Sequence, residues 1–361
     1  MLPVLLRIVI PSGYGLPAAV LAALLLVVGR ALAYQRRLAR QEKPISFLAA
    51  LADDKTTAAI LAVLIGVAWR AGLLDGRISL PLHTYGLLIA TAFVAGIWLA
   101  QREARRQGQD PERVADLSFW ILVAALVGSR VYYIFVNWND YFGDAAWIVT
   151  RVGRIPRLLA VWEGGLVFYG GFIAAVAAGA WYLRRHRMPF LPYADTLIPS
   201  VAFGHFLGRL GCFSAGCCWG APCSPSLPWA TRFPPQSLAY QSFAAREGGA
   251  RFLDPVHLTT LPLHPTQLYE SLGELLLFSV LVLLVRPRKR FHGQVLAVWL
   301  MAYAVLRTTV ESFRGDIERG VVDGLGVGQW TSILIFAAGV AVWVAASRRA
   351  RAARAAEPAL A

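Results

Sequence analysis

Three arginines interrupt long apolar stretches of the sequence: Arg130, Arg209 and Arg307. An ionisable side chain near the centre of a bilayer costs about 2.5–3.5 kcal/mol on insertion scales, so a residue of this kind is a functional candidate by default. A guanidinium group binds phosphate through paired, charge-assisted hydrogen bonds that are strongest where water is scarce. We therefore expect the three arginines to bind an anionic headgroup, and the phosphate of a phospholipid is the obvious candidate.

Acidic residues near the arginines offer a second interpretation. Each arginine could extend to the membrane interface or neutralise a carboxylate, and the candidates are Glu163, Glu270 and Glu311. Glu311 follows Arg307 by four residues, a spacing that lets the two side chains pair along one helix. His205 precedes Arg209 by one helical turn and is either a base or a core histidine with satisfied hydrogen bonds.

All four cysteines of the chain fall in one short segment, at Cys212, Cys217, Cys218 and Cys223. Structural zinc sites usually show Cys-x2–4-Cys pairs with a second pair further along the chain, so this spacing does not predict a metal site. A disulfide in an oxidising compartment and free, buried thiols both fit the pattern. We expect neither a metal nor another cofactor.

The elements that position these residues are membrane-spanning helices. Of 361 residues, 57% are hydrophobic and 16% are charged, against about 45–50% and about 25% in soluble domains. This composition excludes a soluble globular, disordered or fibrous protein and predicts an all-α polytopic membrane protein. Nine stretches are long enough to cross a bilayer; they cover residues 14–33, 56–74, 82–100, 114–136, 164–183, 193–212, 268–285, 292–310 and 328–346.

Basic residues follow alternate spans and fix the expected orientation. The clusters lie at 36–43, 102–113, 184–187, 286–290 and 348–354. The positive-inside rule makes their side cytoplasmic, which puts the N-terminus outside and the C-terminus inside. Topology then accounts for most of the net charge of +14, and no nucleic-acid partner is required. In this orientation the three arginines lie in the outer half of the membrane, at the level of His83, Tyr85, Glu163 and Tyr169.

The longest segment outside the membrane covers about residues 213–267 and contains eight prolines. We expect it to form an ordered but irregular outer head. Next to it, Gly204 and Gly208, and then Gly216 and Gly220, have the GxxxG spacing that allows backbones or a headgroup to approach closely.

Five blocks of the sequence resemble the bacterial prolipoprotein diacylglyceryl transferases. They lie at 82–87, 162–171, 208–220, 264–270 and 307–314, in the order and spacing of that family. The resemblance covers about residues 82–346 and implies a seven-helix family core over 81–346. Residues 1–80 would then add two N-terminal helices, and residues 347–361 a basic cytoplasmic tail.

The resemblance implies transfer of the diacylglyceryl group from phosphatidylglycerol to the lipobox cysteine of a prolipoprotein, in the bacterial cytoplasmic (inner) membrane. A thioether forms and glycerol phosphate leaves. By this resemblance Arg209 binds the phosphate, Arg307 acts near the leaving group, Glu311 orients Arg307, and Tyr85 and His83 line the site. The expected substrate-binding set is completed by Arg130, Gly208, Gly165 and Gly171.

Three positions depart from the family pattern. Tyr169 stands where the family usually has the histidine proposed as general base, and Cys212 and Cys217 replace the usual asparagine and glutamate. Tyrosine, with a pKa of about 10, is a poorer base than histidine at neutral pH. The base is therefore Tyr169, His205 or no side chain at all.

Two other functions compete with this one. A divergent paralogue would move the glycerol-based group to another acceptor, as the change at Tyr169 and the cysteines would allow. A lipid-binding or transport protein without enzymatic activity would use the arginines as an anion pathway. Transporters tend to place their polar site at the midplane between structural repeats, whereas the candidates here gather at one face.

Overall fold

The computed structural model describes residues 4–10, 78–142, 147–150, 153–157, 165–315, 321–322 and 325–356. Two compact units make up the chain. The bundle unit contains Met1–Leu5, His83–Ser129 and Val167–Ala361, and the second unit contains Leu6–Leu82 and Arg130–Leu166. The predicted spans 14–33 and 56–74 lie outside the described residues, apart from five single helical positions, Ala19, Ala23, Leu26, Ala62 and Ile65.

Seven long helices form the described core of the chain, and each overlaps one predicted span. They are α4 (Thr84–Arg106), α5 (Pro111–Val136), α7 (Phe168–Arg185), α8 (Phe190–Ala215), α10 (Thr266–Val280), α11 (Gln294–Glu311) and α12 (Val327–Ala356). A π-helical turn, Leu281–Val285, and a 3-10 turn, Arg286–Arg288, extend α10. The all-helical class predicted from composition is confirmed for this part of the chain.

The ends of two helices differ from the prediction. Helix α4 begins at Thr84 because the preceding segment is strand β2 (Ile78–His83), which forms a two-stranded sheet with β1 (Val4–Ile10). Pro81 disfavours helical geometry for the residue before it and so favours an extended chain there. Helix α12 continues ten residues beyond the apolar run, to Ala356, since alanine and arginine are strong helix formers.

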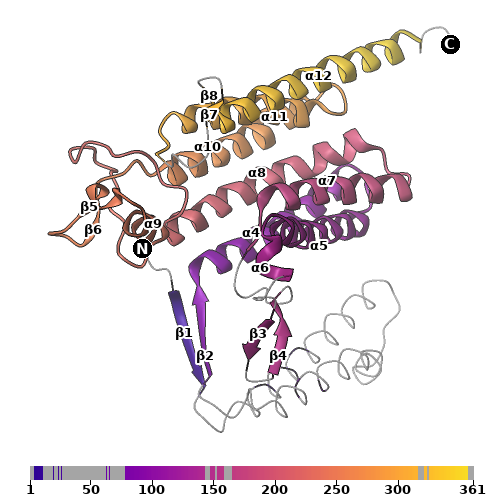
Figure 1. The fold of residues 1–361 in the computed structure, drawn as a ribbon. Helices are drawn as coiled ribbons and strands as arrows, with labels where there is room; N and C mark the ends of the chain where they lie inside the picture. Colours follow the sequence, from indigo (N-terminus) through magenta and orange to yellow (C-terminus); the bar gives the residue numbers. More distant parts are fainter. Residues whose placement is uncertain are drawn as a thin grey trace. The chain divides into compact units, whose positions relative to one another are not determined.

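Helix α8 is central in the bundle unit. It packs against α4, α10 and α11, and α11 packs in turn along α12 (Figure 1). Two apolar cores hold these helices together. One joins α8 to α10 and α11 through Ile198, Ala202, Leu281, Val295 and Leu296. The other includes Ala100, Val114, Leu117, Tyr182 and Tyr193 from α4, α5, α7 and α8.

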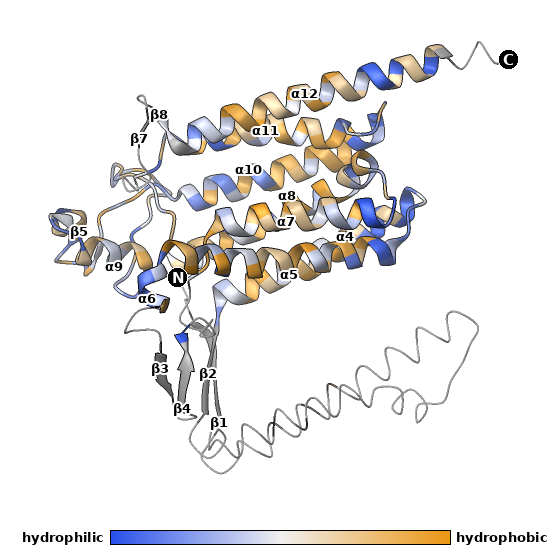
Figure 2. Cartoon of the chain, turned by 45° about the vertical axis from the view of Figure 1, so that its right-hand side comes forward, coloured by the Kyte–Doolittle hydropathy of each residue, from blue (hydrophilic) through white to orange (hydrophobic). Residues whose placement is uncertain are grey.

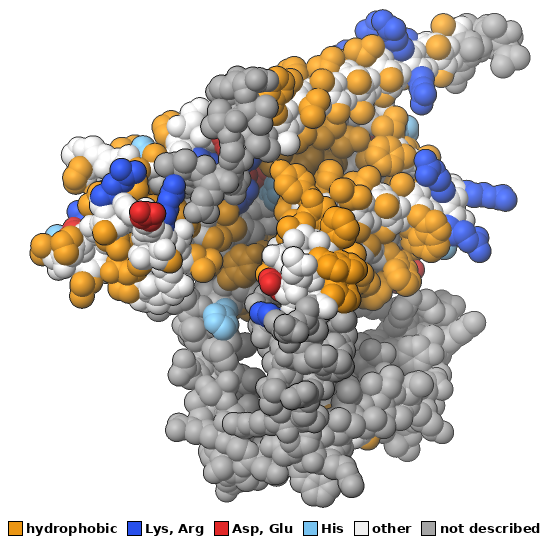
Figure 3. Space-filling model, viewed as in Figure 1, with side chains coloured by type: hydrophobic (Ala, Val, Ile, Leu, Met, Phe, Trp, Pro, Cys, Tyr) orange, Lys and Arg blue, Asp and Glu red, His pale blue; other side chains and the backbone are white. Residues whose placement is uncertain are grey.

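The surface of the bundle unit is that of a membrane protein. Apolar side chains cover much of the visible face of its helices (Figure 3). Phe172, Leu272 and Leu334 are each more than half exposed. The hydrophilic residues that end α4, α7 and α12 gather at the same end of the unit (Figure 2). Four described helical segments are long and apolar enough to cross a membrane: Thr84–Arg106, Pro111–Val136, Thr266–Arg288 and Gly328–Ala355.

The segment between α8 and α10 is ordered around its own small core. It contains helix α9 (Leu238–Ala245), a 3-10 turn (Gly249–Phe252) and the paired strands β5 (Leu253–Asp254) and β6 (Thr259–Thr260). Phe233 and Leu263 are fully buried between these elements. A bridge from Gly220 to Arg314 ties the segment to the chain just after α11, and a bridge from Pro222 to Leu263 joins its two ends to each other.

Shorter elements complete the described chain. The second unit contains helix α6 (Trp138–Phe142) and the antiparallel strands β3 (Trp147–Thr150) and β4 (Gly153–Pro156), in which Ile148 lies opposite Ile155. In the bundle unit, strands β7 (Val321–Val322) and β8 (Leu325–Gly326) form a hairpin before α12.

Candidate functional site

Arg209 lies in the penultimate turns of α8 and is paired with a carboxylate from α10. Its Nη2 atom donates to Oε1 of Glu270 over 2.8 Å. The Glu270 side chain is 1% exposed, and that of Arg209 is 18% exposed. Taking two charges into a dry interior is costly unless they are paired with good geometry, and this contact meets that condition.

Arg307 approaches the same carboxylate from α11. Its Nη1 atom lies 3.8 Å from Oε2 of Glu270, and its Nη2 atom lies 2.6 Å from Oε2 of Glu311. The pairing of Arg307 with Glu311, expected from their spacing of four, is therefore present. Glu270 brings together two arginines from different helices, and we call Arg209, Glu270, Arg307 and Glu311 the arginine cluster.

The arginine cluster has polar atoms that the described residues leave without a hydrogen bond. They are Nη1 of Arg307, Oε2 of Glu270 and Oε2 of Glu311, all buried. Oε2 of Glu311 lies 2.6 Å from Nη2 of Arg307, but this contact does not have the geometry of a hydrogen bond. Buried polar groups are nearly always satisfied in folded proteins, so unsatisfied ones gathered in one place indicate a ligand site or an unseen partner.

A second buried carboxylate, Glu274, lies one turn further along α10 than Glu270. It is 0% exposed, and its Oε1 atom is 2.9 Å from Nδ1 of His205. The His205 ring also packs against the ring of Tyr303. His205 thus pairs with a carboxylate, one turn away from Arg209. This contact is compatible with both interpretations of His205 made from the sequence, a base and a core residue with satisfied hydrogen bonds.

Tyr85 reaches α8 beside the arginine cluster. A Cβ atom at Gly211 would lie 3.1 Å from the ring of Tyr85, so the glycine makes room for this ring. His83 precedes α4 and is exposed. Gly208 faces α4 instead, since its Cβ would lie 3.8 Å from Ile89.

The remaining predicted residues of α7 are not joined to the arginine cluster by any contact among the described residues. Tyr169 is 51% exposed in the first turn of α7 and packs edge-on against Phe168. Gly171 lies where α7 meets α5, because a Cβ there would be 2.2 Å from Oγ of Ser129. Helix packing alone accounts for a glycine at this position.

Arg130 and Gly165 belong to the second unit. Arg130 is 7% exposed and donates to the carbonyl oxygens of Gly165 and Arg157, at 3.4 and 3.3 Å. Its guanidinium group also lies over the rings of Tyr133 and Tyr141. Gly165 has φ +82°, a conformation that favours glycine, and its Cβ would clash with Tyr133. Glu163 lies outside the described residues.

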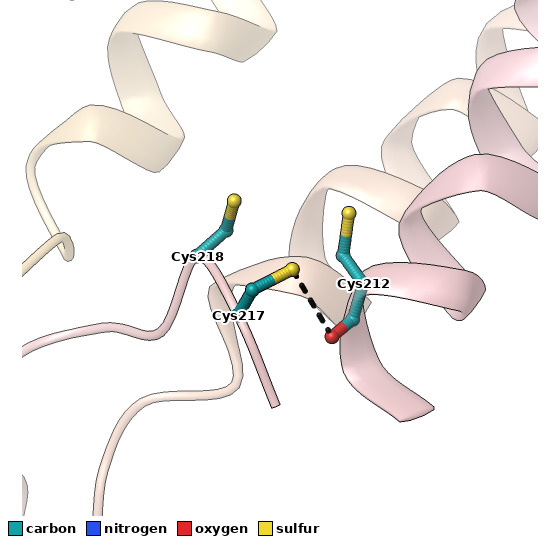
Figure 4. Close-up of side chains that lie close together, drawn as sticks. All are labelled: Cys212, Cys217 and Cys218. Carbon is teal, nitrogen blue, oxygen red and sulfur yellow. Dashed lines mark hydrogen bonds between the residues drawn. The ribbon is translucent and has the colours of Figure 1, made fainter. Parts of the chain in front are cut away.

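Three of the four cysteines form a cluster where α8 ends. The sulfur atoms of Cys212, Cys217 and Cys218 all lie within 4.8 Å of one another, with Cys217 between the other two in Figure 4. All three are free and half-buried. Hydrogen bonds from the other two thiols, with the charges of Arg209 and Arg314, lower the pKa of the Cys218 thiol. We call these residues the thiol cluster.

From the sequence, Glu270 was expected only to neutralise an arginine, and Glu274 was not among the candidates. A signal was available, because Glu270 and Glu274 are spaced by four and must share one face of an otherwise apolar helix. The face of α10 that both carboxylates occupy is the face that α8 covers, which the sequence alone does not reveal.

These features define a helical membrane protein with buried arginine–carboxylate pairs between three of its helices. The sequence model for the prolipoprotein diacylglyceryl transferases matches residues 75–345. The chain belongs to this family, as its sequence blocks suggested.

Named relatives agree with this assignment. A phosphatidylglycerol–prolipoprotein diacylglyceryl transferase of Thermosynechococcus vestitus is 34% identical over 262 residues, which are 72% of this chain and 87% of that protein. The protein of Streptomyces coelicolor named phosphatidylglycerol–prolipoprotein diacylglyceryl transferase 2 is 34% identical over 274 residues, 75% of this chain and 77% of the relative. A relative of the same name as the first, from Paracidovorax citrulli, is 31% identical over 281 residues and is covered to 93% of its length.

Proposed function

We propose that this protein transfers the diacylglyceryl group of phosphatidylglycerol to the thiol of a lipobox cysteine in a prolipoprotein. The convergence of Arg209 and Arg307 on Glu270 is the observation that carries the proposal. The names of the relatives, phosphatidylglycerol–prolipoprotein diacylglyceryl transferase, support both substrates.

In the proposed reaction a bond forms between the thiol sulfur and the terminal carbon of the diacylglyceryl group. The bond between that carbon and the phosphate oxygen breaks. The thiol loses its proton, and glycerol phosphate leaves with the bonding electrons. A guanidinium group carries five N–H donors, and among the described residues Arg209 donates one side-chain hydrogen bond, to Glu270. Arg209 therefore has donors for the departing phosphate, whose growing charge such donors stabilise most where water is excluded.

The other residues have supporting roles in this proposal. Arg307 acts beside the leaving group, Glu311 orients Arg307 through the 2.6 Å contact, and Glu270 positions both arginines. Tyr85 and His83 line the site, and Arg130 and Gly165 contribute to lipid binding, with Gly208 and Gly171 at helix contacts. The thiol proton is taken by Tyr169, by His205 or by no side chain at all.

We further propose nine membrane helices, with residues 1–80 supplying two before the family core of 81–346. The segment 213–267 would form the outer head, and residues 347–361 a cytoplasmic tail. The basic ends of α4, α7, the α10 extension and α12 support an N-terminus outside and a C-terminus in the cytoplasm of a bacterial inner membrane. Reporter fusions at the C-terminus would test this orientation, and activity of a reporter that works only outside the cytoplasm would contradict it.

The activity is tested with purified protein, phosphatidylglycerol vesicles and a peptide that carries a lipobox cysteine. Mass spectrometry should find the peptide heavier by one diacylglyceryl group, and glycerol phosphate should appear in equal amount. A peptide with serine in place of the cysteine is the matched control and should remain unmodified. If a folded, monodisperse sample gives no thioether, the proposed reaction is wrong, whereas modification of another acceptor would favour the divergent paralogue.

A further inference from the structure

The thiol cluster has the dimensions of a metal site. Bonds of about 2.3 Å from zinc to sulfur place tetrahedral sulfur ligands about 3.8 Å apart. The sulfur atoms of Cys212, Cys217 and Cys218 are all within 4.8 Å of one another (Figure 4), so adjustments of well under 1 Å per sulfur would bring them to one ion.

The backbone holds the three thiols in this arrangement. Cys212 is in the last turn of α8, and the N–H group of Cys217 donates to the carbonyl oxygen of Cys212 over 3.1 Å. Cys218 has φ +59°, a left-handed conformation that is unfavourable for a residue other than glycine. Such strain persists only where surrounding structure imposes it, and it gathers at functional sites.

The first turn of α10 provides that surrounding structure. The amide of Gln267 donates to the carbonyl oxygen of Cys217 over 2.7 Å, and the hydroxyl of Thr266 donates to that of Cys218 over 2.9 Å. Both donors are 1% exposed. Two buried hydrogen bonds therefore fix the two adjacent cysteines before any ion arrives, and a preformed site loses less entropy on binding.

Charge and ligand type also favour a cation at this position. Thiolates are soft ligands that select zinc, copper(I) and iron–sulfur clusters among the biological metals. Three thiolates with one zinc ion carry a net charge of −1, which the nearby positive charges of Arg209 and Arg314 offset.

We propose that Cys212, Cys217 and Cys218 bind a thiophilic divalent cation, zinc, beside the arginine cluster. Among the described residues no fourth His, Cys, Asp or Glu joins the group. Three protein ligands and one open position are the coordination pattern of catalytic zinc, whereas structural zinc has four protein ligands. Cys212 follows Arg209 by three residues on α8, so the ion would lie within one turn of the phosphate-binding arginine.

The open position fits the acceptor thiol, an inference that rests on the proposed function. Coordination to the cation replaces the S–H bond by a sulfur–metal bond and releases the proton to water. A thiol bound to zinc is deprotonated outright, so it needs no basic side chain. This would supply the thiolate nucleophile in a chain that has Tyr169 at the position of the usual histidine.

The first experiment measures metal content and needs no transferase activity. Full-length protein purified in detergent, reduced and stripped with a chelator, is titrated with zinc. We expect about one zinc per chain, unchanged in Cys223→Ser, and affinity weakened at least about 100-fold in Cys212→Ser and Cys217→Ser. Cys217→His keeps a zinc ligand and should retain the ion, which separates loss of a ligand from loss of folding.

Three results would overturn the proposal. They are absence of stoichiometric binding by the reduced wild type, equal loss of zinc in Cys223→Ser, and a disulfide within the thiol cluster as the form isolated from cells. Cys223 is a matched control because it lies in the same segment but outside the thiol cluster.

The second experiment asks whether the ion takes the acceptor thiol. Cobalt replaces zinc, and its visible and sulfur-to-cobalt charge-transfer absorption reports the number of thiolate ligands. The lipobox peptide should intensify the charge-transfer band, and the serine peptide should leave it unchanged. An unchanged band with both peptides overturns the assignment of the acceptor thiol even if transfer activity is normal, so failure here is distinct from failure of the proposed function.

Discussion

Helix α8 carries a buried charge toward each end, and the two ends are built differently. Near its beginning, Asp195 is 0% exposed and accepts hydrogen bonds from the N–H groups of Gly293 and Leu296, at 2.7 and 3.0 Å. It also pairs with Nζ of Lys289 at 2.9 Å. Near its end, about 21 Å further along, Arg209 belongs to a cluster with buried polar atoms that no described hydrogen bond satisfies.

The two ends of α8 therefore differ in whether the hydrogen bonds of the buried charge are complete. Asp195 caps α11, because Gly293 and Leu296 provide orphan N–H groups of its first turn, and a carboxylate there also meets the positive end of the helix dipole. Both oxygens of Asp195 are used, so nothing remains for another molecule. The arginine cluster holds its charges in place with two carboxylates and still has donor and acceptor capacity. Buried charges with complete hydrogen bonding stabilise the fold, and the buried atoms of the arginine cluster that lack hydrogen bonds support the proposed binding of a ligand.

Arg209→Ala should have the largest effect on chemistry, a loss of transfer activity of about 100- to 1000-fold. A donor to developing negative charge in a water-poor site contributes about 3–4 kcal/mol to the transition state. Turnover of the lipobox peptide measures the loss, and equal yield from membranes with an unchanged elution profile shows intact folding. A fully active variant would remove Arg209 from the mechanism.

Asp195→Ala should affect stability rather than chemistry. Removing one partner of a buried pair costs about 3–5 kcal/mol, because Lys289 and two N–H groups then lose their acceptor. The fraction of protein that stays monodisperse after heating in detergent measures the effect, and Asp195→Asn should lose less. Specific activity at low temperature should stay within about twofold of wild type. A loss of specific activity as deep as that of Arg209→Ala would erase the distinction between the two ends.

Glu270→Gln should change anion binding at the arginine cluster while preserving the side-chain shape. The change removes a negative charge between Arg209 and Arg307, so inhibition by the product glycerol phosphate should strengthen about tenfold, or about 1.4 kcal/mol. Turnover should fall by a similar factor, since the arginines lose the group that positions them.

Glu274→Gln provides the matched control for this change. Glu274 pairs with His205 on the same face of α10 and should leave the inhibition constant of glycerol phosphate unchanged. If both variants shift the inhibition constant equally, the negative charge of Glu270 does not specifically control anion binding at the arginine cluster.

Gly328→Ala should give the smallest effect, a loss of activity of about three- to fivefold, or about 1 kcal/mol. The added Cβ would lie 2.7 Å from the carboxyl carbon of Glu311, which must move and weaken its contact with Arg307. Gly96→Ala is the control, because its Cβ would only make an ordinary contact of 3.7 Å with α8. Equal activity of the two variants would show that the position of Glu311 does not limit the reaction.

Most of the long described helices could be predicted, because an apolar run of about twenty residues indicates a membrane-spanning helix. The run 292–310 corresponds to α11 at Gln294–Glu311, and the run 193–212 to α8 at Phe190–Ala215. The sheet of β1 and β2 was missed, since it pairs segments nearly seventy residues apart and a short apolar segment does not distinguish strand from helix. Arg209 and Arg307 were predictable as candidates because charge in an apolar run is expensive.

Hydropathy, charge and motif spacing were enough to identify a helical membrane protein, its long described helices, its family and the arginines that need partners. The packing of the helices was needed to show which partners these are: Glu270 for both arginines, Glu274 for His205, and the main-chain N–H groups of α11 for Asp195. It also brought together three thiols whose spacing predicts no metal site. The reason is physical: hydropathy and periodicity are properties of one segment, whereas the pairing of buried charges depends on which faces of separate helices meet.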